Sequence, residues 1–129
     1  MKEEVRTQRA PEAIGPYSQA VSIGRYVFLS GQIPIDPATG EVETGPVGDQ
    51  ARRVLRNLQA VVEEAGATMN DVVKTTVYLT DLMLFADVNE VYTEFFSKPY
   101  PARATVEVSG LPKGADVEID AIVVIGDGV

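Results

Sequence analysis

Two charged residues in the last third of the chain, Arg103 and Glu118, have side chains suited to work on a small carboxylic acid. The planar guanidinium of Arg103 can hold a carboxylate through two parallel hydrogen bonds and stays charged at any working pH. A carboxylate whose pKa is modestly raised can hold a water molecule and move its proton, and Glu118 is a candidate for that task. On residue types alone, Glu107 and Asp120 are equally eligible for that second task. Arg103 could also serve as a salt-bridge partner for these strand carboxylates.

Residue types that are missing narrow the chemistry. The 129 residues include no His and no Cys, which excludes Cys or His nucleophiles, Ser-His-Asp triads and zinc sites built on imidazole or thiolate. The sequence has neither metal-ligand spacing nor a phosphate-binding loop, so we expect no metal and no cofactor. Any chemistry must come from carboxylates, Arg, Lys, Tyr, hydroxyls or backbone groups.

The charge balance limits the partners. Eleven Lys and Arg residues stand against nineteen Asp and Glu, a formal net charge of −8. Nucleic-acid binding needs a basic footprint, so we expect no nucleic-acid partner. The first nine residues are mostly charged or polar, unlike a secretory signal, and the longest aliphatic run, 121–125, is too short to span a membrane. We therefore expect a cytoplasmic protein without a membrane partner.

Side-chain alternation and turn signals divide the chain into short strands. Strands are predicted at 21–23, 26–30, 72–79, 103–109 and 117–125. Gly24-Arg25 is a two-residue hairpin signal between the first two. A second turn is predicted at 36–40, where Pro37 pre-sets φ and Gly40 permits a positive φ. We expect the last two strands to pair with each other around residues 111–114.

Apolar residues at helical spacing predict two helices. The first covers 51–65 and stops at Gly66. The second begins near Asp81 and ends near Ser97, because Pro99 and Pro101 forbid continuation. Without a linker or repeat, residues 1–129 form one domain. The order of elements predicts an α+β fold, a mixed sheet with both helices on one face.

The other face of that sheet must meet water or another subunit. Ile122 and Val124 on this face favour a closed homo-oligomer. If residues 110–115 connect the closing pair of strands, the register places four polar residues on this same face: Arg103, Thr105, Glu118 and Asp120.

Four blocks of sequence carry a family resemblance. They are AIGPYSQA at 13–20, VFLSGQIP at 27–34, PARATVEV at 101–108 and LPKGADVEIDAI at 111–122. In this order they resemble the Rid (YjgF-type) family of enamine/imine deaminases, over residues 12–124. The resemblance implies a chorismate-mutase-like fold and a homotrimer whose sheets assemble into a barrel, with sites in the clefts between subunits.

The resemblance also implies an activity. Substrates of the family are reactive 2-enamino acids and their 2-imino tautomers, which pyridoxal-phosphate enzymes such as threonine or serine dehydratases release, and the products are a 2-keto acid and ammonia. Arg103 matches the arginine that binds the substrate carboxylate, and Glu118 matches the carboxylate that positions the attacking water. An imine is already electrophilic, so these two catalytic side chains suffice without His or cofactor.

Five further residues match substrate-binding positions of the family. Gly31 and Thr105 match positions whose backbone faces the substrate, and Tyr17, Ser30 and Asn89 match positions near the cleft. Thr105 is a departure, because many members carry Cys there. On the sequence alone, each has a plainer alternative: Tyr17 could plug a core edge, Asn89 could face solvent, and Ser30-Gly31 could be only a turn.

Two alternative functions remain open. A non-catalytic module could sense small carboxylates or ketoacids in the same clefts, with Arg103 essential and Glu118 dispensable. A ribonuclease or translation inhibitor, activities attributed to some relatives, fits poorly with a net charge of −8 and no His.

Overall fold

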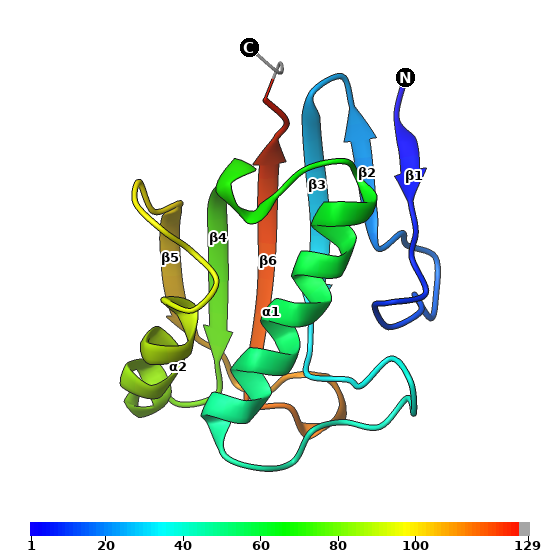
Figure 1. The fold of residues 1–129 in the computed structure, drawn as a ribbon. Helices are drawn as coiled ribbons and strands as arrows, with labels where there is room; N and C mark the ends of the chain where they lie inside the picture. The colour runs from blue at the N-terminus through cyan, green and yellow to red at the C-terminus, as the bar shows by residue number, and fades with distance from the viewer. Residues whose placement is uncertain (127–129) are drawn as a thin grey trace.

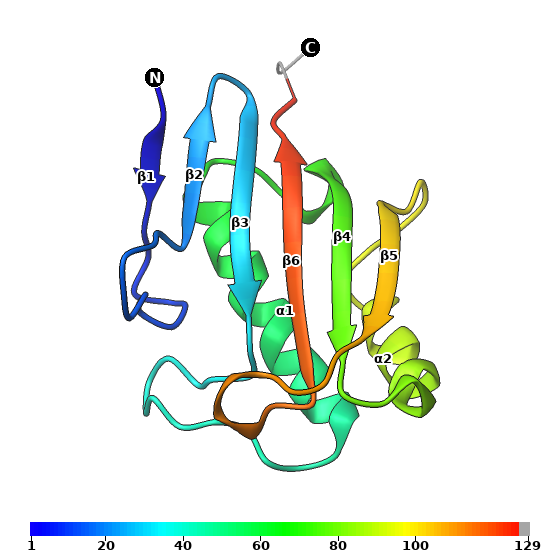
Figure 2. The ribbon, with the colours of Figure 1, turned by 180° about the vertical axis from the view of Figure 1, so that it is seen from behind.

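A computed structural model describes residues 1–126, and these form one twisted six-stranded sheet with two helices on one face (Figures 1 and 2). The strands are β1 (Glu3–Val5), β2 (Ala20–Ile23), β3 (Tyr26–Gln32), β4 (Val72–Leu79), β5 (Ala102–Glu107) and β6 (Val117–Val124). The helices are α1 (Val47–Glu64) and α2 (Phe85–Tyr92), with short 3₁₀ turns at Met69–Asp71, Leu82–Leu84 and Pro112–Gly114. The predicted α+β class is confirmed.

The strand order is β1-β2-β3-β6-β4-β5. Every neighbouring pair is antiparallel except β4 and β5, which run parallel because α2 crosses over between them. The two central strands, β6 and β4, alternate buried with partly exposed residues. Val117, Ile119 and Val123 of β6 lie fully buried beneath α1. This apolar layer fixes which face of the sheet receives the helices.

The local predictions at the hairpin and at the end of α1 are confirmed. Gly24 turns β2 into β3 with a φ of 58°, and Gly66 follows α1 with a φ of 87°. Both values lie in the left-handed region that an L side chain rarely adopts. The turn at 36–40 is also present: Gly40 has a φ of 77° and donates its N–H to the Asp36 carbonyl.

The second helix is shorter than predicted. Asp81 accepts the N–H of Met83 and starts a 3₁₀ turn, so α2 begins only at Phe85. At the other end, the Thr93 hydroxyl donates to the Glu90 carbonyl, and the chain tightens into turns after Tyr92. Strand β1 was not predicted at all, because three residues, of which only Val5 is buried, carry no usable alternation.

The prediction that the last two strands pair with each other is wrong. Strand β4 lies between them: Thr75 pairs with Arg103 of β5 on one side and with Ala121 of β6 on the other. Arg103 and Thr105 therefore share the helix-covered face with Ala121. Glu118 and Asp120 point to the opposite face, so the predicted common face for all four residues is also wrong. Burial explains why β6 pairs elsewhere. Its buried apolar residues are covered on both sides because β6 lies at the centre of the sheet, between β3 and β4.

Figure 2 shows the sheet face that carries no helices. Exposed apolar side chains lie on this face. Tyr26 and Phe28 of β3 are 53% and 44% exposed, and they pair in register with Val124 and Ile122 of β6. This group is called the open-face patch below. No helix within residues 1–126 has the length and hydropathy to cross a bilayer.

Candidate active site

Glu118 lines a cavity of roughly 620 Å³ beside the end of β3. Four of the predicted site residues meet there, namely Tyr17, Ser30, Gly31 and Glu118. The rest of the wall comes from the N-terminal segment, the end of β3 with the chain after it, and the Pro112–Gly114 turn. Its apolar residues are Pro11, Ile14, Ile33, Ile35 and Pro112, and its polar residues are Glu12, Gln19, Gln32 and Lys113. Together these form the Glu118 cavity.

A glycine at position 31 makes room for the Glu118 carboxylate. The register between β3 and β6 shifts between Leu29 and Gln32, and this irregularity brings Gly31 against Glu118. A Cβ built on Gly31 would collide with the Glu118 carboxylate and would lie 2.9 Å from its carboxyl carbon. The plain interpretation of Ser30-Gly31 as only a turn is therefore incomplete, since the glycine permits close approach.

The Glu118 carboxyl has a pKa above its ordinary value, chiefly because burial disfavours the charged form and secondarily because the Asp120 charge is near. No side-chain hydrogen bond or ion pair within residues 1–126 engages it. Asp120, in contrast, accepts a hydrogen bond from the Tyr78 hydroxyl at 3.0 Å, and Glu107 accepts the Leu82 N–H at 3.0 Å. Glu118 is thus the uncommitted carboxylate of the three candidates.

Tyr17 lies in a loop beside this cavity and is 54% exposed, so it does not plug the core. Its hydroxyl oxygen accepts the N–H of Ile14 at 3.4 Å. Ser30 is held by a 2.6 Å hydrogen bond from its hydroxyl to the Ser18 carbonyl, which ties the end of β3 to the same loop. Both residues shape one side of the Glu118 cavity.

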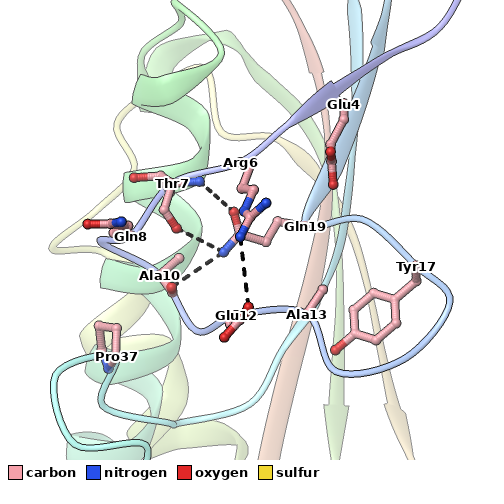
Figure 3. A pocket seen from close by; sticks show the side chains of 10 residues that line it. All are labelled: Glu4, Arg6, Thr7, Gln8, Ala10, Glu12, Ala13, Tyr17, Gln19 and Pro37. Carbon is pink, nitrogen blue, oxygen red and sulfur yellow. Dashed lines mark hydrogen bonds and ion pairs between the residues drawn. The ribbon is translucent and has the colours of Figure 1, made fainter.

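Gln19 was missed by the sequence reasoning, although it lies in the first family block. Its buried amide clamps the N-terminal segment: the side-chain oxygen accepts the Thr7 N–H at 2.7 Å and the NH₂ donates to the Pro11 carbonyl at 2.8 Å. Figure 3 shows the bonds from Gln19 to Thr7 and Ala10, in a neighbouring hollow of roughly 420 Å³ that Tyr17 also lines. Because Pro11 and Glu12 also line the Glu118 cavity, Gln19 fixes one of its walls.

Arg103 lies in a different place, at the β5 edge beneath α2. It lines a hollow of roughly 390 Å³ with Asn89, Tyr92, Tyr100 and neighbouring residues, called the Arg103 hollow below. Its Nη1 donates to the Asn89 side-chain oxygen at 2.8 Å, so Asn89 faces the arginine. The guanidinium carbon lies 4.8 Å from the Tyr92 ring centre and 5.2 Å from that of Phe85.

No carboxylate within residues 1–126 forms an ion pair with Arg103, which removes the salt bridge that the sequence left open. Thr105 follows two residues later on the same strand and same face, half-buried. A cationic group held by aromatic rings and an amide, without an acidic partner in this part of the chain, is suited to bind an anion.

One chain does not bring the seven predicted residues together. Tyr17, Ser30, Gly31 and Glu118 line the Glu118 cavity, whereas Asn89 and Arg103 line the Arg103 hollow and Thr105 lies next to it. The strand register puts Arg103 and Glu118 on opposite faces of the sheet. Within residues 1–126 no group of acidic residues has the arrangement of a metal site.

Comparison with known proteins places this arrangement in a family. The family model described as endoribonuclease L-PSP matches residues 7–125. The chain belongs to this family. A 2-iminobutanoate/2-iminopropanoate deaminase of Dermatophagoides farinae is 50% identical over 96% of the chain and 97% of that protein. The Rid (YjgF-type) resemblance of the four sequence blocks is thereby confirmed.

Solved structures of family members agree with the fold. The crystal structure of Escherichia coli TdcF with bound serine matches with a TM-score of 0.91 and 50% identity, covering 96% of this chain and 99% of that one. A Thermotoga maritima protein, provisionally called an endoribonuclease, matches with a TM-score of 0.95 and 50% identity over 98% and 99% of the two chains. Family members therefore carry both deaminase and endoribonuclease names.

Proposed function

We propose that this protein hydrolyses reactive 2-enamino acids and their 2-imino tautomers to 2-keto acids and ammonia, without a cofactor. The observation that carries the proposal is Glu118, a half-buried carboxyl with a raised pKa and no engaged partner in the described chain, on the wall of a largely apolar cavity. A partly buried carboxyl with a raised pKa can accept a proton from water and return it to a leaving group. The deaminase name of the Dermatophagoides farinae relative supports the same reaction.

The complete site in this proposal forms between two copies of the chain. Arg103 and Glu118 are on opposite faces of one sheet, so an Arg103 hollow must meet the Glu118 cavity of a neighbouring copy. The open-face patch gives the copies an apolar surface to bury. Head-to-tail contacts of this kind close into rings, and the family resemblance favours a homotrimer with a chorismate-mutase-like barrel.

Arg103 binds the substrate carboxylate in this mechanism. Its aromatic neighbours contact the face of the guanidinium and Asn89 uses one N–H, which leaves other N–H groups to pair with the two carboxylate oxygens. The protein has a net charge of −8 and repels an anion at long range, so a local cation is required to hold one.

Glu118 moves the proton of the attacking water. The imine nitrogen first takes up a proton from solvent. Water then adds to C2 as the Glu118 carboxylate accepts one of its protons, and the C=N electron pair goes to nitrogen, which gives a carbinolamine. Glu118 gives its proton to the amino group of the carbinolamine. The C–N bond breaks, ammonia leaves, and the hydroxyl returns a proton to solvent as the C=O bond forms. The sum is imine plus water to keto acid plus ammonia, with no oxidation.

The proposal is tested with imine generated in place. An amino-acid dehydratase and its substrate release the enamine, and keto-acid formation is followed with and without the protein. We expect acceleration by the wild type and its loss in Arg103→Ala and Glu118→Gln. Arg56→Ala and Glu107→Gln are matched controls outside both hollows and should keep the wild-type rate. An unchanged rate with wild type, or full activity in Arg103→Ala, contradicts the proposal.

A binding module for small carboxylates is the second candidate. The TdcF relative crystallised with serine, an amino acid of the size that such a module would hold. This candidate predicts that wild type binds 2-oxobutanoate without accelerating imine hydrolysis, and that Glu118→Gln keeps the same affinity. The endoribonuclease name is less well supported, because the chain combines a net charge of −8 with no His.

A further inference from the structure

We propose that Tyr92 and Thr75 are positioning residues that fix the Arg103 guanidinium in the orientation that receives a carboxylate. The proposal rests on the proposed function for its consequence in catalysis. Its structural part concerns a buried hydroxyl pair beneath the Arg103 hollow that none of the family motifs in the sequence includes.

The pair is tightly built. The Tyr92 hydroxyl and the Thr75 Oγ1 lie 2.7 Å apart, with Tyr92 only 5% exposed and Thr75 fully buried. Tyr92 is the last residue of α2, and the ring of Phe96 also packs against it at 4.5 Å between centres. Burial raises the pKa of the Tyr92 phenol, so the ring stays neutral.

The pair also connects Arg103 to its own strand neighbour. Thr75 of β4 is the register partner of Arg103 of β5. The Tyr92 hydroxyl is therefore fixed to the strand next to Arg103, while the Tyr92 ring contacts the guanidinium at 4.8 Å. Helix α2, strand β4 and the arginine are held as one unit, and a shift of α2 would move the surface on which Arg103 rests.

Stacking suits this task because it uses none of the N–H donors. Ring contact holds the face of the guanidinium, and the edge stays available for the two oxygens of a carboxylate. An exposed arginine without such contacts samples many rotamers, and a ligand must then stop that motion. If Tyr92 were only a core residue, it would stabilise the fold and its replacement would leave the orientation of Arg103 unchanged.

The test separates these roles with four variants and a control. Tyr92→Phe and Thr75→Val each remove the hydroxyl pair but keep the ring, the double variant removes both hydroxyls, and Tyr92→Leu removes the ring. Val88→Ala is the control, because Val88 is buried on the same helix and is absent from the Arg103 hollow. The readouts are the NMR signal of the Arg103 Nε–H, the affinity for 2-oxobutanoate, and KM and kcat for the imine.

We expect Tyr92→Leu to move the Arg103 Nε–H signal toward that of a free arginine and to raise Kd and KM about 10-fold, with kcat nearly unchanged. Each single hydroxyl variant should raise Kd and KM about 3-fold. The double variant should raise them no further, because each single variant already breaks the same hydrogen bond. Val88→Ala should lower Tm and leave the signal and KM unchanged.

An unmoved Arg103 signal in Tyr92→Leu overturns the proposal, as does a KM in Val88→Ala that rises as far as in Tyr92→Leu. Failure of the proposed function gives a different result. A wild-type protein that does not hydrolyse the imine refutes that function and leaves the positioning role of Tyr92 and Thr75 untouched. The Arg103 signal and the 2-oxobutanoate affinity then still decide whether Tyr92 and Thr75 position the arginine.

Discussion

Replacing Gly31 with alanine should greatly lower activity while leaving the fold intact. The added Cβ would overlap the Glu118 carboxylate, and its nearest further neighbour is the Glu118 carboxyl carbon at 2.9 Å. The carboxylate oxygen and the carboxyl carbon are at the end of a side chain that faces a cavity. The Glu118 side chain can therefore rotate away, and the backbone need not move. We therefore expect a stability cost below the about 1–3 kcal/mol typical of overpacking in a closed core.

The effect on catalysis should be much larger. A carboxylate displaced by about 1 Å from its water can lose about 100-fold in rate, so kcat/KM should fall by about that factor. Gly110→Ala is the matched control: a Cβ there meets nothing within 4 Å and Gly110 does not have a positive φ. The assay is keto-acid formation together with Tm for both variants. A Gly31→Ala protein with wild-type kcat/KM would refute the reasoning that links Gly31 to Glu118.

Three further outcomes follow from the same structure. The pKa of Glu118 is raised in the folded protein, so ionising this carboxyl lowers the stability of the fold once the pH rises above the unfolded value of 4.5. Glu118→Gln should therefore have a higher Tm than wild type at pH 7, and the difference should vanish below that value. A lower Tm of Glu118→Gln at pH 7 would contradict this. Loss of the buried Gln19 amide orphans the Thr7 N–H, so Gln19→Ala should lower the free energy of unfolding in urea by about 1–3 kcal/mol, whereas the exposed Gln8→Ala should not. Thr105→Cys should keep kcat/KM, because the resemblance assigns the contact to backbone; a marked change would assign it to the side chain.

Elements set by short-range signals could be predicted from the sequence. The Gly24-Arg25 hairpin, the 72–79 strand and the stop of α1 at Gly66 depend on residues adjacent in the chain. The pairing of β5 could not be predicted in this way. It depends on α2, which crosses over and places β5 parallel to β4, and no local sequence pattern indicates that crossover. The same limit produced the wrong common face for Arg103 and Glu118.

The site was predictable in its members but not in its arrangement. Family blocks pointed to Arg103 and Glu118, and the structure then showed why Asp120 is the weaker candidate, since Tyr78 already engages it. The contact of Gly31 with Glu118 needs a register irregularity in β3, and the Tyr92 hydroxyl reaches Thr75 across 17 residues. Neither leaves a spacing signal in the chain.

The central claim, that Arg103 and Glu118 act together across two copies, is tested most directly by mixing two inactive variants. Arg103→Ala and Glu118→Gln are refolded separately and as an equimolar mixture, and keto-acid formation is measured for each. If each site takes Arg103 from one copy and Glu118 from its neighbour, about a quarter of the sites in the mixture are intact, and about that fraction of wild-type activity should return. A mixture no more active than either variant alone would contradict the account.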